Sequence, residues 1–283
     1  MGDGDVAARG GTAPGDRGGG RMALTALRGA LGFLTRIPVG RDEAAWGAFA
    51  RSPWTFPVVG YPVGALVAAP LLLAAPPASV PAPTVALAFV LAVYAVTGIG
   101  HLDGVADLGD AAVVHGDREE RRRVLKDSEL GVGGTVALAL VVFGLATAAL
   151  GLVEVGAGTG DVGVPVAALG VVVAAEVGAK TATATLVCVG DAPHEGLGSA
   201  LTGESSPRAA LPVLALAAPA ALLAWPRLLP GLAALLAALA TAALVRRWVR
   251  RRLGGVSGDA LGATTEIARV AALHAGVIAW TRF

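Results

Sequence analysis

The chain contains a long segment without charge, and this segment restricts the fold more than any other feature. No Asp, Glu, Lys or Arg occurs between Ser52 and Leu102. A segment of this length has room for two helices of about 20 residues, the length that crosses a membrane. Only 15% of the 283 residues are charged, against about 25% in soluble domains, and the mean hydropathy is +0.69. The sequence therefore predicts an all-α, polytopic helical membrane bundle.

Seven segments are predicted as transmembrane helices, which gives a bundle of about six to seven spans. They are 58–78, 84–99, 133–153, 163–189, 209–225, 228–245 and 261–280. The apolar stretch 22–37 is shorter and contains two arginines, so it fits a helix lying along the membrane surface. Residues 1–21 are rich in Gly, Asp and Arg and are predicted to be a disordered leader. Residues 22–283 are expected to form a single membrane domain.

Basic residues are concentrated in alternate loops. The stretch 103–132 and the residues after 245 are rich in Arg, whereas 76–83 and 154–162 contain no Lys or Arg. The positive-inside rule places the basic loops in the cytoplasm. We therefore expect a multi-pass protein of the cytoplasmic (inner) membrane with its functional residues on the cytoplasmic side. The net charge of +1 and the absence of a basic stripe interleaved with aromatic residues predict no nucleic-acid partner.

Three aspartates follow the uncharged segment in the stretch TGIGHLDGVADLGD (97–110). Asp103 and Asp107 are four residues apart, and Asp107 and Asp110 three, so on one helix they share a face. Like charges at this spacing repel and are costly near a bilayer. A divalent cation would remove that cost, and magnesium commonly joins carboxylates to substrate phosphates. The pattern favours a metal site over a solvated helix end.

Two further stretches carry polar residues next to glycines. In KDSELGVGG (126–134), Lys126 and Ser128 are suited to bind a phosphate, and the glycine-rich turn opens a helix whose N-terminus attracts anions. An ordinary basic loop explains this stretch about equally well. In EGLGSALTG (195–203), Glu195 precedes two glycines, which also suits a plain surface turn.

The stretch LGGVSGDALGATTE (253–266) places Asp259 at the start of a helix. Taken alone, Asp259 is best explained as an N-cap, and the alternative is a further metal ligand. Glu266 and Arg269 are three residues apart and either pair inside the bundle or contact substrate. Among the four histidines, His101 stands out because it is close to Asp103.

Together with FLTRIPV (33–39) and FPVVGYPVGAL (56–66), these stretches resemble the cobalamin synthases, the adenosylcobinamide-GDP ribazoletransferase family. The most specific parts are HLDGVAD and GDALGA. The resemblance implies a magnesium-dependent integral membrane phosphotransferase of class EC 2.7.8. Such an enzyme transfers the adenosylcobinamide phosphate moiety of adenosylcobinamide-GDP to α-ribazole or its 5′-phosphate. The products are adenosylcobalamin or its 5′-phosphate, and GMP.

The resemblance also implies roles for individual residues. The expected metal ligands are Asp103, Asp107, Asp110 and Asp259. The expected catalytic residues are Asp103, Asp107 and Asp127, the last as a base or as support for the site. The expected substrate-binding residues are His101, Lys126, Ser128, Lys180, Glu195 and Glu266. Lys180 lies in the span before EGLG, where the family has an arginine. The expected nucleophile is the ribazole 5′-hydroxyl. The expected partners are the small-molecule substrates and membrane lipid, and self-association or association with other cobalamin-pathway enzymes is left open.

Two other classes of membrane protein are less consistent with the sequence. CDP-alcohol phosphotransferases also use an aspartate-rich helix, but DGVAD lacks the arginine that follows the alanine in their pattern. Transporters usually place their site near the membrane midplane, whereas the aspartates here cluster at one edge of the predicted bundle.

Overall fold

The computed structural model describes residues 16–40, 42–75, 78–127, 129–157 and 166–283. Within these ranges all regular secondary structure is helical, which confirms the all-α prediction. The elements are α1 (Asp16–Leu34), α2 (Glu43–Ala50), α3 (Thr55–Ala68), η1 (Ala69–Ala74), α4 (Ala82–Thr97), α5 (Gly100–Val113), α6 (Arg118–Val124), α7 (Val132–Ala157), α8 (Val166–Val189), α9 (Leu197–Thr202), η2 (Pro207–Ala209), α10 (Ala210–Ala217), η3 (Ala218–Leu222), α11 (Leu228–Arg252) and α12 (Gly258–Arg282).

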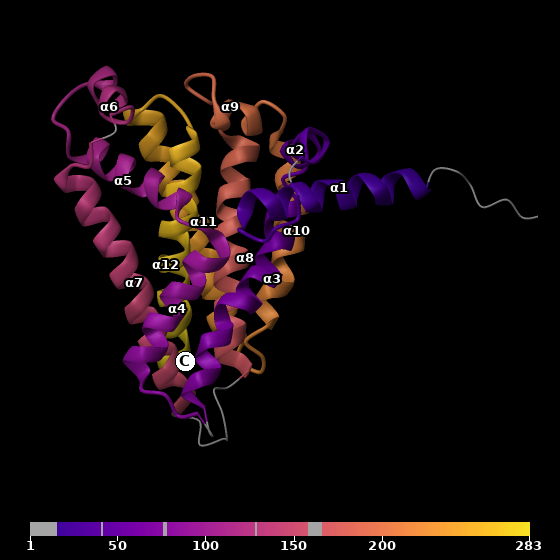
Figure 1. Ribbon diagram of the computed structural model, residues 1–283, viewed down its shortest axis with the longest axis vertical. Helices are drawn as coiled ribbons and strands as arrows, with labels where there is room; N and C mark the ends of the chain where they lie inside the picture. Colours follow the sequence, from indigo (N-terminus) through magenta and orange to yellow (C-terminus); the bar gives the residue numbers. More distant parts are fainter. Residues whose placement is uncertain (1–15, 41, 76–77, 128, 158–165) are drawn as a thin grey trace, which may run out of the picture.

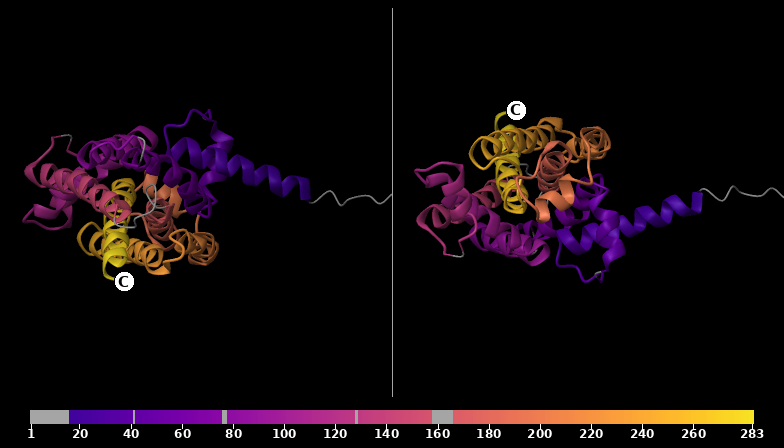
Figure 2. Two further views of the ribbon diagram at one scale, coloured as in Figure 1. Left: turned by 90° about the horizontal axis from the view of Figure 1, so that it is seen from below. Right: turned by 90° about the horizontal axis from the view of Figure 1, so that it is seen from above.

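The long helices form a bundle around α8. Helices α3, α10, α11 and α12 all pack against α8, and the end-on views show it near the centre (Figure 2). Small residues permit this close packing, because a Cβ at Gly60 or Gly64 of α3 would lie 2.7 or 2.6 Å from a Cα of α8. Glycines spaced by four residues let membrane helices approach in this way.

The number of membrane spans is only partly settled by the helices of the described residues. Four segments are long and apolar enough to cross a membrane: Thr55–Ala74, Val132–Gly156, Ala168–Val189 and Leu228–Arg252. Counting α4 and α5 together as one bent span gives five. The apolar segment Pro207–Leu222 is shorter, and α12 contains Glu266 and Arg269. A multi-pass membrane protein is supported, but the predicted count of six to seven is not confirmed.

The connections between the long helices gather at the two ends of the bundle. Helices α6 and α9 and the end of α11 lie at one end, and the C-terminus lies at the other (Figure 1). The arginines of α6 and those in the last turn of α11 therefore share one end. Helix α1 runs crosswise to the bundle (Figure 1), as expected for a surface helix. It begins at Asp16, inside the predicted leader, of which residues 1–15 lie outside the described residues.

The aspartate-rich stretch does not continue the preceding span. Helix α4 ends at Thr97, Gly98 adopts a positive φ of 79°, and α5 leaves at an angle of 102° to α4. A positive φ is available to glycine without steric cost, so Gly98 permits the turn. Helix α5 therefore crosses the bundle, and we treat it as lying outside the membrane-spanning segments.

Candidate functional site

Helices α5 and α12 approach each other closely because glycines stand at both contact points. A Cβ at Gly104 of α5 would lie 2.4 Å from the backbone oxygen of Asp259. A Cβ at Gly262 of α12 would lie 3.2 Å from the Cα of His101. A side chain larger than hydrogen at either position would separate the two helices. The contact brings the aspartates of α5 next to Asp259.

Three aspartates form the acidic part of the site. Asp103 is exposed, and Asp107 and Asp259 are partly buried. Burial, followed by the charges of Asp103, Asp259 and Asp110, raises the pKa of the Asp107 carboxyl from 3.8 to about 7. Burial and neighbouring negative charges both disfavour the ionised form of a carboxyl group, so the crowded aspartates carry an electrostatic cost. A bound cation would relieve this crowding.

Asp259 is not the N-cap of α12. The cap is Ser257, whose Oγ accepts a hydrogen bond from the Ala260 N–H at 3.2 Å. The same hydroxyl donates to the Asp259 Oδ2 over 3.3 Å. The capping role first considered for Asp259 therefore belongs to Ser257, and the Asp259 carboxylate lies beside α5.

Asp110 faces α7 and has a structural role. Its two carboxylate oxygens accept hydrogen bonds from the Gly131 and Gly134 N–H groups, both at 2.8 Å. A Cβ at either glycine would lie within 2.6 Å of these oxygens. The glycine-rich turn does bind an anion at a helix N-terminus, but that anion is the protein's own carboxylate. Both oxygens of Asp110 are thus engaged by α7, and its expected role as a metal ligand stays a prediction.

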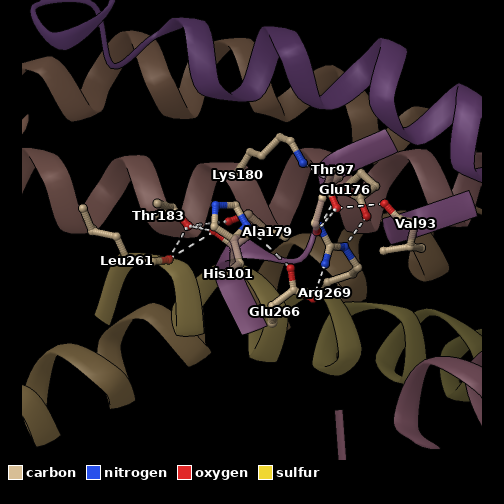
Figure 3. Close-up of polar contacts among 12 residues, drawn as sticks. Val93, Thr97, His101, Glu176, Ala179, Lys180, Thr183, Leu261, Glu266 and Arg269 are labelled. Carbon is tan, nitrogen blue, oxygen red and sulfur yellow. Dashed lines mark hydrogen bonds and ion pairs between the residues drawn. The ribbon is translucent and has the colours of Figure 1, made fainter. Parts of the chain in front are cut away.

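A buried network of charges links α5, α8 and α12 (Figure 3). Arg269 bonds both Glu176 and Glu266, and Lys180 donates to Glu176 at 2.8 Å. All four side chains are at most 2% exposed. Two carboxylates balance two cations, as buried charges require. Lys180 was expected to bind substrate, but its partner is Glu176 inside the bundle.

His101 lies at the edge of this network. Its Nδ1 is 3.6 Å from the Glu266 Oε1, and both atoms are buried without a hydrogen-bond partner. The distance is longer than that of a hydrogen bond, and the contact is an ion pair when the imidazole is protonated. Glu266 therefore lies beside the His101 ring and, being fully buried, does not itself reach solvent.

A cavity of about 310 Å³ opens beside His101 and Asp259. Its lining also includes Thr183, His194 and Leu197, so it lies where α5, α8, α9 and α12 meet. Ligand-binding cavities are typically of about 300 to 1,000 Å³. This cavity extends from Asp259, the member of the acidic cluster that lines it, to His194 in the polar loop before α9, and this loop is exposed at Glu195.

Lys126 and Asp127 lie at the same end of the bundle (Figure 1) but outside this cavity. Lys126 and Asp127 are exposed just after α6. Asp127 accepts a hydrogen bond from the Glu129 N–H at 3.1 Å. Ser128 lies outside the described residues.

The acidic cluster suits a hard divalent cation in its chemistry but is not a closed metal cage. Among the described residues, no three His, Cys, Asp or Glu side chains converge closely enough to bind a metal ion by themselves. Magnesium differs from zinc in this respect, because it keeps several waters and usually takes one or two carboxylates plus substrate phosphates. Asp103, Asp107 and Asp259 supply such oxygen donors, so the residues fit magnesium bound together with substrate.

Glu176 was missed by the sequence prediction. The sequence did contain a sign of its role, because Glu176 is an acidic residue in the apolar segment 163–189 and stands four residues before Lys180. Charged residues inside membrane helices are rare and usually paired or functional. The partner Arg269 on another helix was not predictable from this spacing.

Comparisons with known proteins agree with these features. A family model described as cobalamin-5-phosphate synthase matches residues 26–277. A protein of Halorubrum lacusprofundi is 84% identical over 93% of this chain and 100% of its own length. Proteins of Haloquadratum walsbyi and Halobacterium salinarum are 47% and 51% identical over 92% and 71% of this chain and 99% and 97% of their own. All three are named adenosylcobinamide-GDP ribazoletransferase. No solved structure matches the chain at a significant level.

Proposed function

The chain belongs to the cobalamin-5-phosphate synthase family, and from this membership we infer that it is an enzyme acting on adenosylcobinamide-GDP in the last step of cobalamin synthesis. It transfers the adenosylcobinamide phosphate moiety to α-ribazole or α-ribazole 5′-phosphate and releases GMP. The observation that carries this conclusion is the 84% identity to a named ribazoletransferase over that protein's whole length.

The bond changes restrict which ribazole oxygen attacks. A hydroxyl oxygen bonds to the phosphorus on the cobinamide side of the pyrophosphate. The bond from that phosphorus to the bridging oxygen breaks, GMP leaves, and the hydroxyl proton is released. When the acceptor is α-ribazole 5′-phosphate, its 5′ oxygen is already esterified. The 5′-hydroxyl expected from the sequence is then unavailable, so another ribose hydroxyl is the nucleophile.

Asp103, Asp107 and Asp259 are the proposed magnesium-binding residues. The support is the raised pKa of Asp107, which burial and then the charges of the neighbouring aspartates cause, together with an all-oxygen donor set. Magnesium, when bound, neutralises charge on the pyrophosphate and on the departing GMP. Asp110 is left out of this set because both of its oxygens accept hydrogen bonds from α7.

The other polar residues position the substrates. His101 faces the cavity beside Asp259 and lies next to Glu266. Lys126 is exposed at the same end and offers a point charge to a phosphate. Phosphate contacts of Lys126 and Ser128, a role of Asp127 as base or support, and substrate contacts of Glu195 remain predictions.

The decisive experiment measures GMP release by the purified full-length protein with magnesium, adenosylcobinamide-GDP and α-ribazole. The variants Asp103→Asn and Asp107→Asn are compared with Glu154→Gln, which removes one exposed negative charge outside the site. We expect each Asp variant to lose about 100-fold or more of the activity, the upper range for weakening a metal's supporting residues. Mn²⁺ binding, followed by electron paramagnetic resonance, gives a second readout that needs no turnover.

The possible outcomes separate the reaction from the metal site. Absence of GMP with the wild-type protein would refute the reaction. Wild-type activity and Mn²⁺ binding in both Asp variants would refute the metal residues while leaving the reaction in place.

The proposed location is the cytoplasmic membrane, with the acidic cluster facing the cytoplasm. The support is the gathering of the arginines of α6 and α11 at one end of the bundle (Figure 1), because basic loops stay on the cytoplasmic side. The variant Arg118→Cys, in a Cys188→Ala background that removes the single native cysteine, should react with an impermeant thiol reagent only after the membrane is opened. Labelling of intact cells would show that this end of the bundle faces the outside of the cell.

A further inference from the structure

A large groove lies on the opposite side of α5 from the aspartates. Its cavity volume is about 840 Å³. Helices α5 and α12, which pack together, form its floor, and α7 and α11 form its two sides. The side chains along it are apolar, among them Leu108, Val245, Trp248 and Val270. We call this space the lateral groove.

The lateral groove is open to the surroundings of the bundle. Its lining residues Leu140 and Leu244 are 66% and 68% exposed, and Ile267 is 37% exposed. Figure 1 shows α7 leaning away from the bundle toward the end that carries α6. Both α7 and α11 are long and apolar enough to cross a membrane. The exposed leucines therefore face the hydrocarbon of the bilayer, and the groove is accessible from it.

One end of the lateral groove is strongly basic. Arg247, Arg251 and Arg252 line it there and are exposed. Within the described part of the chain, their side chains form no hydrogen bond or ion pair. Two nearby arginines differ, since Arg118 donates to the Arg251 carbonyl and Arg246 to the Val189 carbonyl. The three groove arginines thus present positive charges that no carboxylate of the described chain neutralises.

We propose that the lateral groove binds an anionic phospholipid of the surrounding membrane. An acyl chain lies along the apolar lining, and the phosphate lies between Arg247, Arg251 and Arg252. Guanidinium groups match phosphate oxygens through paired hydrogen bonds. Basic residues next to a membrane helix attract anionic headgroups. Trp248 stands between Arg247 and Arg251 in sequence, and tryptophan favours the headgroup level of a membrane.

An anionic lipid fits better than a free phosphate or a neutral lipid. A free phosphate would leave the apolar lining unused, and a neutral lipid would leave three positive charges unbalanced. The binding site requires neither the proposed reaction nor magnesium, so a failure of either leaves it testable. Its position is nevertheless relevant to the reaction, because Val105 and Leu108 of α5 line the groove. A bound lipid therefore packs against the face of α5 that is opposite its aspartates.

The test uses lipids with brominated acyl chains, which quench tryptophan fluorescence on contact. The full-length protein in detergent micelles is titrated with brominated phosphatidylglycerol and, separately, with brominated phosphatidylcholine. The chain has five tryptophans, so the signal of Trp248 is the part of the quenching that a Trp248→Phe variant loses. We expect phosphatidylglycerol to quench Trp248 at roughly one tenth of the concentration that phosphatidylcholine needs, since each basic residue near a surface adds to anionic binding.

Two triple variants test the role of the arginines. Arg247→Gln, Arg251→Gln and Arg252→Gln together should abolish the preference for phosphatidylglycerol. The matched control, Arg21→Gln, Arg51→Gln and Arg208→Gln, removes the same charge from exposed arginines outside the groove and should retain it.

Several results would overturn the proposal. These are equal quenching of Trp248 by both lipids, no quenching by either, and a preference that survives in the first triple variant. Loss of the preference in the control as well would show that net charge acts and not the groove. Displacement of the lipid by adenosylcobinamide-GDP would show that the groove holds substrate.

Discussion

The buried charge network makes the sharpest prediction about stability. Glu176, Lys180, Glu266 and Arg269 are at most 2% exposed and carry two charges of each sign. Replacing Arg269→Met keeps most of the side-chain volume but leaves two carboxylates with one ammonium group. Breaking a buried ion pair from one side costs about 3–5 kcal/mol, because a charge is left without a partner. With roughly 2–3 °C per kcal/mol for a chain of this size, the midpoint of thermal unfolding should fall by about 6–15 °C.

A double variant tests whether charge balance is the cause. Arg269→Met combined with Glu266→Gln leaves Glu176 with Lys180, which is again neutral. Replacing a buried ionic group by neutral residues is often much less costly than breaking it, so this variant should recover at least about half of the loss. The measurement is thermal unfolding in one detergent, followed by the fraction that stays soluble and monodisperse. A single variant as stable as the wild type, or a double variant no better than the single one, would refute the reasoning.

Three further predictions concern α5. Gly104→Ala should destabilise the protein by about 1–3 kcal/mol by overpacking, since its Cβ would meet the Asp259 backbone. Gly100→Ala is the control and should be tolerated, because nothing lies within 4 Å of its Cβ. Equal midpoints of thermal unfolding for the two variants would contradict this prediction. Asp110→Ala should lower the free energy of unfolding by about 1.5–3 kcal/mol through loss of two charge-assisted hydrogen bonds. Its affinity for Mn²⁺ should stay nearly unchanged, and a large loss of that affinity would show that Asp110 is a metal ligand. Because the folded-state pKa of Asp107 is raised from 3.8 to about 7, the folded metal-free protein binds more protons than the unfolded chain between these values, so its stability should fall as pH rises from about 4 to 7. Asp107→Asn should flatten that dependence, and an unchanged slope would show that Asp107 is not its source.

Local patterns allowed a good part of the fold and the site to be predicted. The lack of charge from 52 to 102 predicted membrane helices. The alternation of arginine-rich and uncharged loops predicted that the arginine-rich loops lie together at one end of the bundle. The aspartates of 103–110 were recognised as crowded negative charge because helical spacing is a local property.

Other features depended on which helices become neighbours. Asp110 has the same helical spacing as Asp103 and Asp107, but only the position of α7 turns its carboxylate into a helix cap. Lys180 stood out as a cation in an apolar span, yet its role follows from Glu176 and, through it, from Arg269 on α12. Asp259 could be assigned as an N-cap from sequence alone, but Ser257 takes that role in the folded chain.

The sequence by itself determined the membrane class, the family and the residue types available to bind a cation, because hydropathy, motif spacing and charge are properties of the chain read in order. Only the tertiary structure decided which carboxylates share a site and which form capping hydrogen bonds or ion pairs. It also decided where arginines of the described chain remain unpaired beside an apolar groove. The reason is physical: the energy of a charge depends on its burial and on partners within a few ångströms. In a helical bundle, those partners come from segments far apart in the sequence.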